Sequence, residues 1–393
     1  MSARRMLGTG LVAVLLGALA LVPVLAPRAD AAGEGGCSVD FQIDETLPNG
    51  GSWSMCWESR AREGIVLHDV TYTPPGGSAT LVLAQMNLSQ IHVPYDSNVA
   101  RFHDVSDFGL GFNFDELTAA ECPNGVLLSD GTQDVLCRQV LATGYAYKAY
   151  DDQAQGESLN LFSVSAIGAY NYIVQWTFDD DGTIHPAVGA TGQLQMYGGG
   201  PATGWHVGAN GYAVAHMHDF YWRLDFDLAG TGADRVQELA AAPSADRQTF
   251  TNTRTAFTTE QARRVQPRSF RSWRVIDTAT TNADGHRISY ELLPSTDAIF
   301  RGPSYEPFTH NELYATRFAA CEVFASHNST SGGCGGDLSD FANGQSLGGA
   351  DVVLWYGTSF HHLPRDEDED VMDAHWSGFS LVPRDLTATY PTP

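Results

Sequence analysis

The chain has 393 residues, and its 46 acidic against 22 basic side chains give a formal charge of −24 at pH 7. This acidity argues against a nucleic-acid-binding protein, because such binding relies on Lys and Arg to neutralise phosphates. An acidic surface instead raises the local concentration of cations, protonated amines included.

The N-terminal residues 1–31 have the pattern of a secretory signal peptide. Two arginines precede an apolar run at 11–25, and Ala-Asp-Ala at 29–31 offers a small-residue cleavage site. The run is short for a membrane span, which needs ~20 apolar residues, and no later stretch comes near that length. We therefore expect a signal peptide at 1–31 and a secreted, soluble mature protein at 32–393.

The mature part is expected to form one large all-β domain. Its 40 glycines, 15 tyrosines and 19 phenylalanines favour sheet, and no Pro/Ser-rich linker divides it. Strands are expected at 64–72, 79–86, 159–166, 172–178 and 352–356. One helix is expected at 233–242, where Val236, Leu239 and Ala240 fit a helical period beside Arg235 and Glu238.

The six cysteines fall into three sequential pairs, namely Cys37 with Cys56, Cys122 with Cys137, and Cys321 with Cys334. Export favours local disulfides, although six cysteines formally allow 15 connectivities. A metal cluster is disfavoured, because the sequence has no Cys-x-x-Cys pair. The acidic run at 366–370 is expected to be a solvated loop.

Two histidine pairs are candidates for metal binding. His216 and His218 stand two apart, so on a strand they share one face while Met217 points away. His361 and His362 follow far downstream. An all-imidazole set suits copper or zinc and is poor for magnesium or calcium.

Several segments together resemble the catalytic domain of the copper-containing, topaquinone-dependent amine oxidases. The resemblance covers about 53–383 and depends on the order and spacing of its motifs. They are Arg-Glu-Gly-Ile-Val-Leu-His-Asp-Val (62–70), Val-Pro-Tyr (93–95), Phe-His-Asp-Val-Ser-Asp-Phe-Gly-Leu-Gly (102–111), Ile-Gly-Ala-Tyr-Asn-Tyr (167–172), Asp-Gly-Thr-Ile (181–184), Val-Gly-Ala-Thr-Gly (188–192), the segment from Asp351 to Arg365, and Gly-Phe-Ser-Leu (378–381). The resemblance implies a large β-sandwich with few short helices, a homodimer, and oxidation of small primary amines by O2.

The resemblance also implies a copper site. The family binds Cu(II) through three imidazoles, which correspond to His216, His218 and His362. His362 is preferred over His361 because its distance from Asp351 matches the family spacing.

Three further residues match the family's cofactor and catalytic positions. Tyr170 corresponds to the tyrosine that becomes topaquinone. Asp104 matches the general base that removes a proton from the substrate carbon next to nitrogen. Tyr95 matches a tyrosine that hydrogen-bonds the cofactor and orients its ring.

A second ion site follows from the resemblance. Asp225, Asp227 and Asp351, with the backbone carbonyls of Phe226 and Val352, match a peripheral calcium or manganese site. Oxygen-only ligands suit such hard cations.

The sequence departs from the family pattern at four positions. Ala169 and Asn171 replace an Asn and an acid on either side of the cofactor tyrosine, which predicts a less firmly held ring and a changed charge beside the copper. Phe102 replaces a gating tyrosine and suggests an apolar channel wall, and Ser106 replaces a glycine.

Two other functions fit the same residues. The first is a non-enzymatic or partner-dependent copper-binding protein, in which the cofactor tyrosine stays unmodified. The second is a zinc hydrolase that uses the histidines with Asp104, and it leaves Tyr170 unexplained.

Overall fold

The computed structural model describes residues 37–391 apart from 97–99, 197–201, 203, 231, 233 and 330–333. The signal peptide expected at 1–31 lies outside this part of the chain. Among the described helices, none has the length and apolar character needed to cross a membrane.

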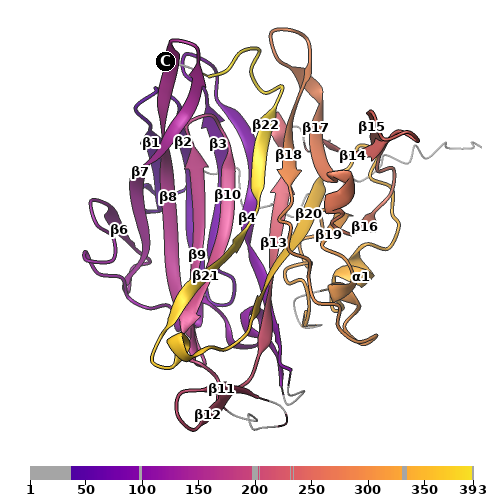
Figure 1. The fold of residues 1–393 in the computed structure, drawn as a ribbon. Coiled ribbons are helices and arrows are strands. Elements are labelled where there is room, and N and C mark those ends of the chain that lie inside the picture. The colour runs from indigo at the N-terminus through magenta and orange to yellow at the C-terminus, as the bar shows by residue number, and fades with distance from the viewer. Residues whose placement is uncertain are drawn as a thin grey trace, which may run out of the picture.

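Two large antiparallel sheets dominate the fold and lie against each other as a sandwich (Figure 1). The first sheet has nine strands, with the order β1-β2-β3-β4-β13-β20-β19-β16 and β5 paired to β4. These are β1 (Gln42–Thr46), β2 (Ser52–Arg60), β3 (Gly64–Thr73), β4 (Thr80–Pro94), β5 (Arg101–His103), β13 (His216–Phe226), β16 (Gln261–Arg263), β19 (Leu313–Arg317) and β20 (Val352–His362).

The second sheet has eleven strands, with the order β15-β14-β17-β18-β22-β10-β9-β8-β7-β6 and β21 paired to β10. These are β6 (Val126–Ser129), β7 (Asp134–Ala149), β8 (Asp152–Ile167), β9 (Tyr170–Asp179), β10 (Ile184–Gly192), β14 (Asp234–Pro243), β15 (Phe250–Ala256), β17 (Ser272–Thr281), β18 (Arg287–Leu293), β21 (Met372–Gly378) and β22 (Ser380–Arg384). A small ribbon of β11 (Trp205–Val207) and β12 (Gly211–Ala213) lies at one end of the sandwich (Figure 1).

The described helices are short, as the resemblance implied, and the all-β prediction is confirmed. They are the α-helix α1 (Leu338–Phe341), the π-helix η2 (Asp104–Phe108), and the 3-10 helices η1 (Val39–Phe41), η3 (Gly111–Asn113), η4 (Leu228–Gly230), η5 (Pro267–Ser269), η6 (Pro307–His310) and η7 (Asp366–Asp368).

The helix expected at 233–242 is wrong. Asp234–Pro243 form β14, which pairs with β15 and β17. Val236 lies opposite Val275 and is fully buried, whereas the preceding Arg235 is exposed. A short run of apolar residues fits both the period of a helix and that of a strand, and here the strands that pair on both sides decide the conformation.

Aromatic side chains fill the space between the sheets. Trp176 of β9 meets Trp222 of β13 edge-on with ring centroids 6.0 Å apart, and Trp53 of β2 lies 5.0 Å from Phe178. Alternate residues of β9 are buried, from Tyr170 onward, as expected for a strand with one face on the core. This alternation aims Tyr170 at the opposite sheet.

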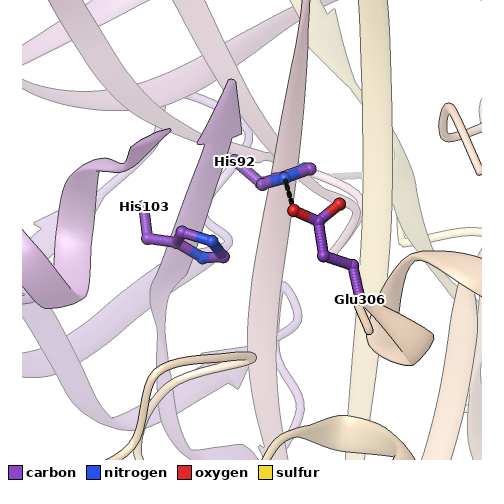
Figure 2. Close-up of side chains that lie close together, drawn as sticks. All are labelled: His92, His103 and Glu306. Atoms are coloured by element: carbon purple, nitrogen blue, oxygen red, sulfur yellow. Dashed lines mark ion pairs between the residues drawn. The ribbon is translucent and has the colours of Figure 1, made fainter. Parts of the chain in front are cut away.

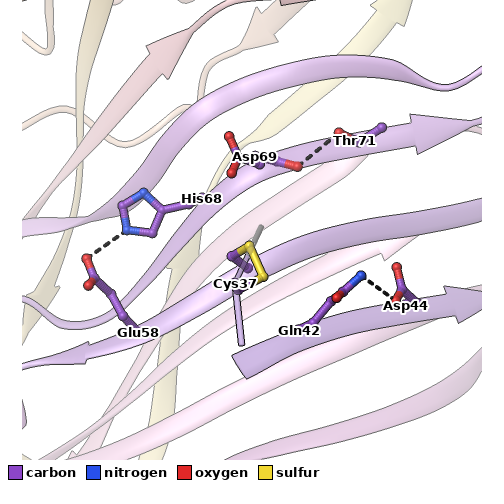
Figure 3. Close-up of a disulfide and its surroundings, with 8 residues drawn as sticks. Cys37, Gln42, Asp44, Glu58, His68, Asp69 and Thr71 are labelled. Carbon is purple, nitrogen blue, oxygen red and sulfur yellow. Dashed lines mark hydrogen bonds and ion pairs between the residues drawn. A yellow bond between two sulfur atoms is a disulfide. The ribbon is translucent and has the colours of Figure 1, made fainter. Parts of the chain in front are cut away.

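The three predicted disulfides are confirmed. They join Cys37 to Cys56, Cys122 to Cys137, and Cys321 to Cys334. The first ties the N-terminal segment to β2, next to the Glu58–His68 pair that links β2 to β3 with a 2.7 Å contact (Figure 3). Closing a loop of ~15 residues in this way is worth about 3 kcal/mol of stability.

Candidate active site

The pairing of β13 with β20 brings three histidines onto one face. His216 lies directly opposite His362, and residues opposite each other on neighbouring strands share a face. The His216 ring centroid is 4.8 Å from that of His218 and 5.0 Å from that of His362. His361 is opposite Met217 and exposed. The structure therefore groups His362, and not His361, with the first two histidines.

Tyr170 reaches these rings from the other sheet. A two-residue turn joins β8 to β9, since Ile167 pairs with Tyr170 across Gly168 and Ala169. Gly168 has φ +64°, the pattern of a type II′ hairpin turn with glycine first. The turn makes Tyr170 the first residue of β9. Its ring centroid lies 4.6 Å from that of His218.

The Tyr170 hydroxyl lies among the imidazoles. It is within hydrogen-bond distance of His216 Nε2 and 3.1 Å from His362 Nδ1. Met372 Sδ lies 3.4 Å from the same hydroxyl. The phenol oxygen is thus positioned where it would be a neighbour of any ion held by the three rings.

The ring nitrogens that face away from Tyr170 have other partners. His216 Nδ1 lies 3.1 Å from the Val214 carbonyl, and His218 Nδ1 lies 3.3 Å from the Tyr172 hydroxyl. His218 Nε2 is buried without a hydrogen-bond partner among the described residues. Partners of this kind fix the orientation of metal-binding imidazoles.

Asp368 orients the third histidine, and it is the one residue of the run at 366–370 that departs from the expected solvated loop. Asp368 is fully buried, and its carboxylate lies 3.1 Å from His362 Nε2. It also accepts a 3.2 Å hydrogen bond from Arg365 Nε. The other four acids of the run at 366–370 are exposed. A run of like charges does not reveal in advance that one member turns inward to a histidine.

Burial disfavours the protonated form of all three imidazoles. Burial, followed by repulsion from neighbouring histidines, lowers the pKa of His216 to about 3 and that of His218 well below its usual value. Burial also lowers the pKa of His362. Three buried, oriented imidazoles beside a phenol are a donor set that fits Cu(II).

Asp104 lies next to this group with a pKa suited to proton transfer. It begins η2, and its Oδ2 accepts a 2.7 Å hydrogen bond from the Tyr172 hydroxyl. Burial raises the pKa of Asp104 to about 7, although the Tyr172 hydrogen bond opposes the shift. The rings of Tyr172 and Tyr170 are stacked with centroids 6.0 Å apart.

Tyr172 links the candidate base to the candidate metal site, and sequence reasoning assigned it no role. Its spacing could have indicated this role, because a residue two positions after Tyr170 on the same strand faces the same side of the sheet.

Tyr95 and Phe102 line one side of the site. Tyr95 forms a β-bridge with His216, and the two ring centroids are 5.0 Å apart. Phe102 meets Tyr95 edge-on at 5.9 Å. A cavity of about 120 Å³ opens onto Tyr95 and His216, with Phe300 and His361 in its wall. The expected bond from Tyr95 to a cofactor oxygen stays a prediction.

The departures from the family pattern have local explanations. Asn171 is half-buried between Tyr170 and Tyr172 in an alternating strand, and it donates a 2.6 Å hydrogen bond to Asp115 Oδ2. It therefore faces away from the histidines, and the expected change of charge beside the metal is wrong. Ala169 lies in the turn that precedes β9. Ser106 accepts a 2.8 Å hydrogen bond from Gln90 Nε2.

The predicted second ion site is a group of buried and half-buried carboxylates at the far end of β13. Phe226 pairs with Val352, so Asp225, Asp227 and Asp351 flank one rung of the sheet.

Several of these carboxylates are not compensated. Asp225 contacts Arg223 at 3.2 Å, yet Oδ1 of Asp225, Asp234 and Asp351 are buried with no hydrogen-bond partner among the described residues. Burial, followed by the charges of neighbouring aspartates, raises the pKa of Asp351 to about 7. Burial likewise raises the pKa of Asp234, a residue that the sequence did not single out, to about 7. The donor set fits a hard cation.

Two packed sheets that enclose three buried imidazoles, a buried tyrosine and a carboxyl group define a β-sandwich protein with a histidine-rich site in its core. A family profile described as "Copper amine oxidase, enzyme domain" matches residues 49–392. The chain belongs to the copper amine oxidase family.

Curated relatives share about a quarter of their residues with this chain. It is 25% identical over 386 residues to a primary amine oxidase of Arthrobacter sp. (strain P1), covering 86% of this chain and 59% of that protein. It is 24% identical over 387 residues to a histamine oxidase of Arthrobacter globiformis, covering 87% and 56%. The chain thus spans less than two thirds of the length of these relatives.

Solved structures show the same fold. A copper-containing benzylamine oxidase from Hansenula polymorpha has a TM-score of 0.75 at 20% identity, with 89% of this chain and 62% of that chain covered. An amine oxidase from Aspergillus nidulans has a TM-score of 0.74 at 21% identity, with 93% and 56% covered.

Proposed function

We propose that the protein is a copper- and topaquinone-dependent primary amine oxidase, which converts R-CH2-NH2, O2 and water to an aldehyde, ammonia and hydrogen peroxide. The observation that carries the proposal is the position of the Tyr170 hydroxyl against His216 and His362. Membership of the copper amine oxidase family and the names of the curated relatives support it.

In this proposal His216 and His218 hold copper through Nε2, and His362 holds it through Nδ1. These are the nitrogens left over once Val214, Tyr172 and Asp368 have taken the others. Copper, together with a topaquinone formed from Tyr170, would supply the two-electron oxidation of the amine, and O2 would accept the two electrons and leave as hydrogen peroxide.

Asp104 takes the proton from the substrate carbon next to nitrogen. A pKa of about 7 leaves it about half ionised at neutral pH, so it can both accept and release a proton there. A placed carboxylate of this kind is commonly worth ~10²–10⁴-fold in rate. Tyr172 holds the carboxylate in place and favours its ionised form.

Three further properties belong to the proposal. Export is supported by the leader pattern and by the three disulfides. Calcium or manganese at the Asp225 and Asp351 cluster is supported by the unpartnered carboxylate oxygens there. A homodimer is supported by the family resemblance alone.

The test is aerobic copper loading of the purified protein. The wild type is expected to turn pink, to shift its visible band with phenylhydrazine, and to release peroxide with at least one member of a panel of primary amines. Tyr170→Phe is expected to bind copper yet stay colourless and produce no peroxide. A wild type that holds copper but stays colourless would refute the enzymatic proposal in favour of a non-enzymatic copper-binding protein.

A further inference from the structure

A second cluster of metal-binding side chains lies outside the candidate active site. His92 lies on β4 and His103 on β5, and Glu306 immediately precedes η6. The three side chains point toward one another (Figure 2). Their ligand atoms lie within 4.8 Å of one another, which holds for no other set of His, Cys, Asp or Glu side chains in the described part of the chain. The exposed fractions are 0%, 4% and 5%, respectively.

The cluster lies on the opposite face of the first sheet from the copper-site histidines. His218 and Asp219 are consecutive on β13, so their side chains point to opposite faces. Asp219 pairs with His92 across β13 and β4, and its Oδ2 lies 3.1 Å from His92 Nδ1. The same carboxylate accepts a 2.7 Å hydrogen bond from the Ser359 hydroxyl. The two histidine groups are therefore separate sites.

Each imidazole of the cluster is oriented through one nitrogen. Asp219 engages Nδ1 of His92, and the Ser326 hydroxyl lies 2.8 Å from Nδ1 of His103. His92 Nε2 is fully buried and makes no hydrogen bond, although Glu306 Oε1 lies 3.5 Å away. A histidine held by a carboxylate or hydroxyl at one nitrogen, with the other aimed at an acidic group, is the arrangement that surrounds bound metals.

We propose that His92, His103 and Glu306 bind a zinc ion that the amine oxidase reaction does not require. Two imidazoles and one carboxylate are a common zinc donor set, with water as the fourth ligand. Calcium and magnesium are disfavoured because they prefer all-oxygen sites.

The three groups of the cluster differ in protonation: burial opposes a charge on His92, but the carboxylates of Asp219 and Glu306 outweigh it and raise the pKa of His92. Burial, followed by the charges of neighbouring histidines, lowers the pKa of His103 to about 3, so its ring is neutral. Burial opposes ionisation of Glu306, but its contacts with His92 and Arg101 outweigh this effect and lower its pKa to about 2.

Arg101 is the competing cation at this site. Its Nε donates a 2.5 Å hydrogen bond to Glu306 Oε1, and its second contact is to Oε2. Zinc therefore shares the Glu306 carboxylate with Arg101, taking one oxygen and leaving the other to the guanidinium.

The bound ion ties two neighbouring strands to a segment that is distant in sequence. It connects β4 and β5 to the loop before η6, and His103 immediately precedes Asp104. An ion that binds the folded chain stabilises it by mass action. Zinc here acts as a clamp on the backbone that carries Asp104.

The experiment counts zinc ions in protein that already holds copper. Chelator-stripped protein is loaded with one equivalent of Cu(II), exposed to zinc, desalted and analysed for both metals, together with His103→Phe and Glu306→Gln. His185→Gln is the matched control, because His185 also pairs with a carboxylate, Asp179 at 2.9 Å, but belongs to no cluster of three. We expect wild type and control to retain one zinc more per chain than either cluster variant. Zinc bound elsewhere, at the aspartate cluster for example, cancels in this difference.

Equal zinc in the wild type and both cluster variants would overturn the proposal. A second measurement uses the unmodified chain and so does not depend on the folding of a variant. Crystals soaked in zinc should give an anomalous peak at the zinc absorption edge between His92, His103 and Glu306. An empty map at that position also overturns it, whether or not the protein oxidises amines.

Discussion

The hydrogen bond from Tyr172 to Asp104 sets the pH at which the candidate base ionises. The Tyr172 hydroxyl donates to Asp104 Oδ2 at 2.7 Å and lowers a pKa that burial raises to about 7. Tyr172→Phe removes this donor and keeps the ring. The pKa of Asp104 is therefore expected to rise in the variant.

The size of the rise follows from the energy of the bond. A hydrogen bond to a charged group contributes about 1.5–3 kcal/mol, and one pKa unit corresponds to about 1.4 kcal/mol. The pKa of Asp104 should therefore rise by ~1–2 units. Because the base must be ionised, activity rises with pH through this pKa. At pH 7 the ionised fraction would fall from about one half to roughly 1–10%, a loss of ~5–50-fold in rate that is regained above pH 9.

The assay is the pH dependence of cofactor reduction by amine, measured anaerobically by stopped flow. Copper content is measured first, because the Tyr172 hydroxyl also lies 3.3 Å from His218 Nδ1. Tyr147→Phe is the control, since it removes a Tyr–Asp hydrogen bond of 3.2 Å at the surface, to Asp152. An acidic limb that stays in place in copper-replete Tyr172→Phe would refute the assignment of Asp104 as the base.

Three more predictions concern the metals and the cofactor strand. Asp368→Asn removes the carboxylate behind His362 and should weaken copper binding ~10–100-fold in competition with a chelator, and an unchanged affinity would argue against its orienting role. Asn171→Asp places a second carboxylate against that of Asp115 and should lower the Tm by roughly 2–10 °C in calorimetry, while copper content and colour stay normal. A loss of colour would contradict the orientation of this side chain. Because the pKa of Asp351 is raised to about 7, its protonated form stabilises the fold below pH ~4, and this contribution is lost as the pH rises through about 7. Ca²⁺ should therefore raise the Tm of chelator-treated protein at pH 8 and have little effect at pH 4.5. An equal effect at both pH values would contradict the site.

Much of the fold was predictable, because a strand with one buried face shows an alternation of apolar and polar residues in its own sequence. The buried alternation that begins at Tyr170 is visible in the sequence, and the spacing of His216 and His218 places both on one face. The three disulfides were predictable because each closes a short loop. Features of this kind depend on residues close together in the sequence, so the sequence alone predicts them.

Other features depended on partners that a sequence does not reveal. Val236 lies on β14 because β15 and β17 supply hydrogen bonds on both sides, which the apolar spacing does not report. Asp368 turns inward because His362 has a free nitrogen there. Tertiary contacts decided both, against the local pattern.

The His92 cluster could not be predicted for the same reason. His92 and His103 belong to no recognisable metal motif, and Glu306 follows about two hundred residues later. Only the pairing of β4 with β5 and with β13, and the docking of the loop before η6, bring the three together.

Strand β13 connects the two histidine groups because it is buried on both faces. His216 and His218 point to the space between the sheets, and Asp219 points to His92 on the other side. A slip of one residue in its pairing would exchange the faces and remove His216 and His218 from Tyr170. The same slip would withdraw Asp219 from His92. Both sites therefore depend on one register, and a variant that disturbs the pairing of β13 should lose copper and zinc together, whereas variants at either set of ligands should lose only one metal.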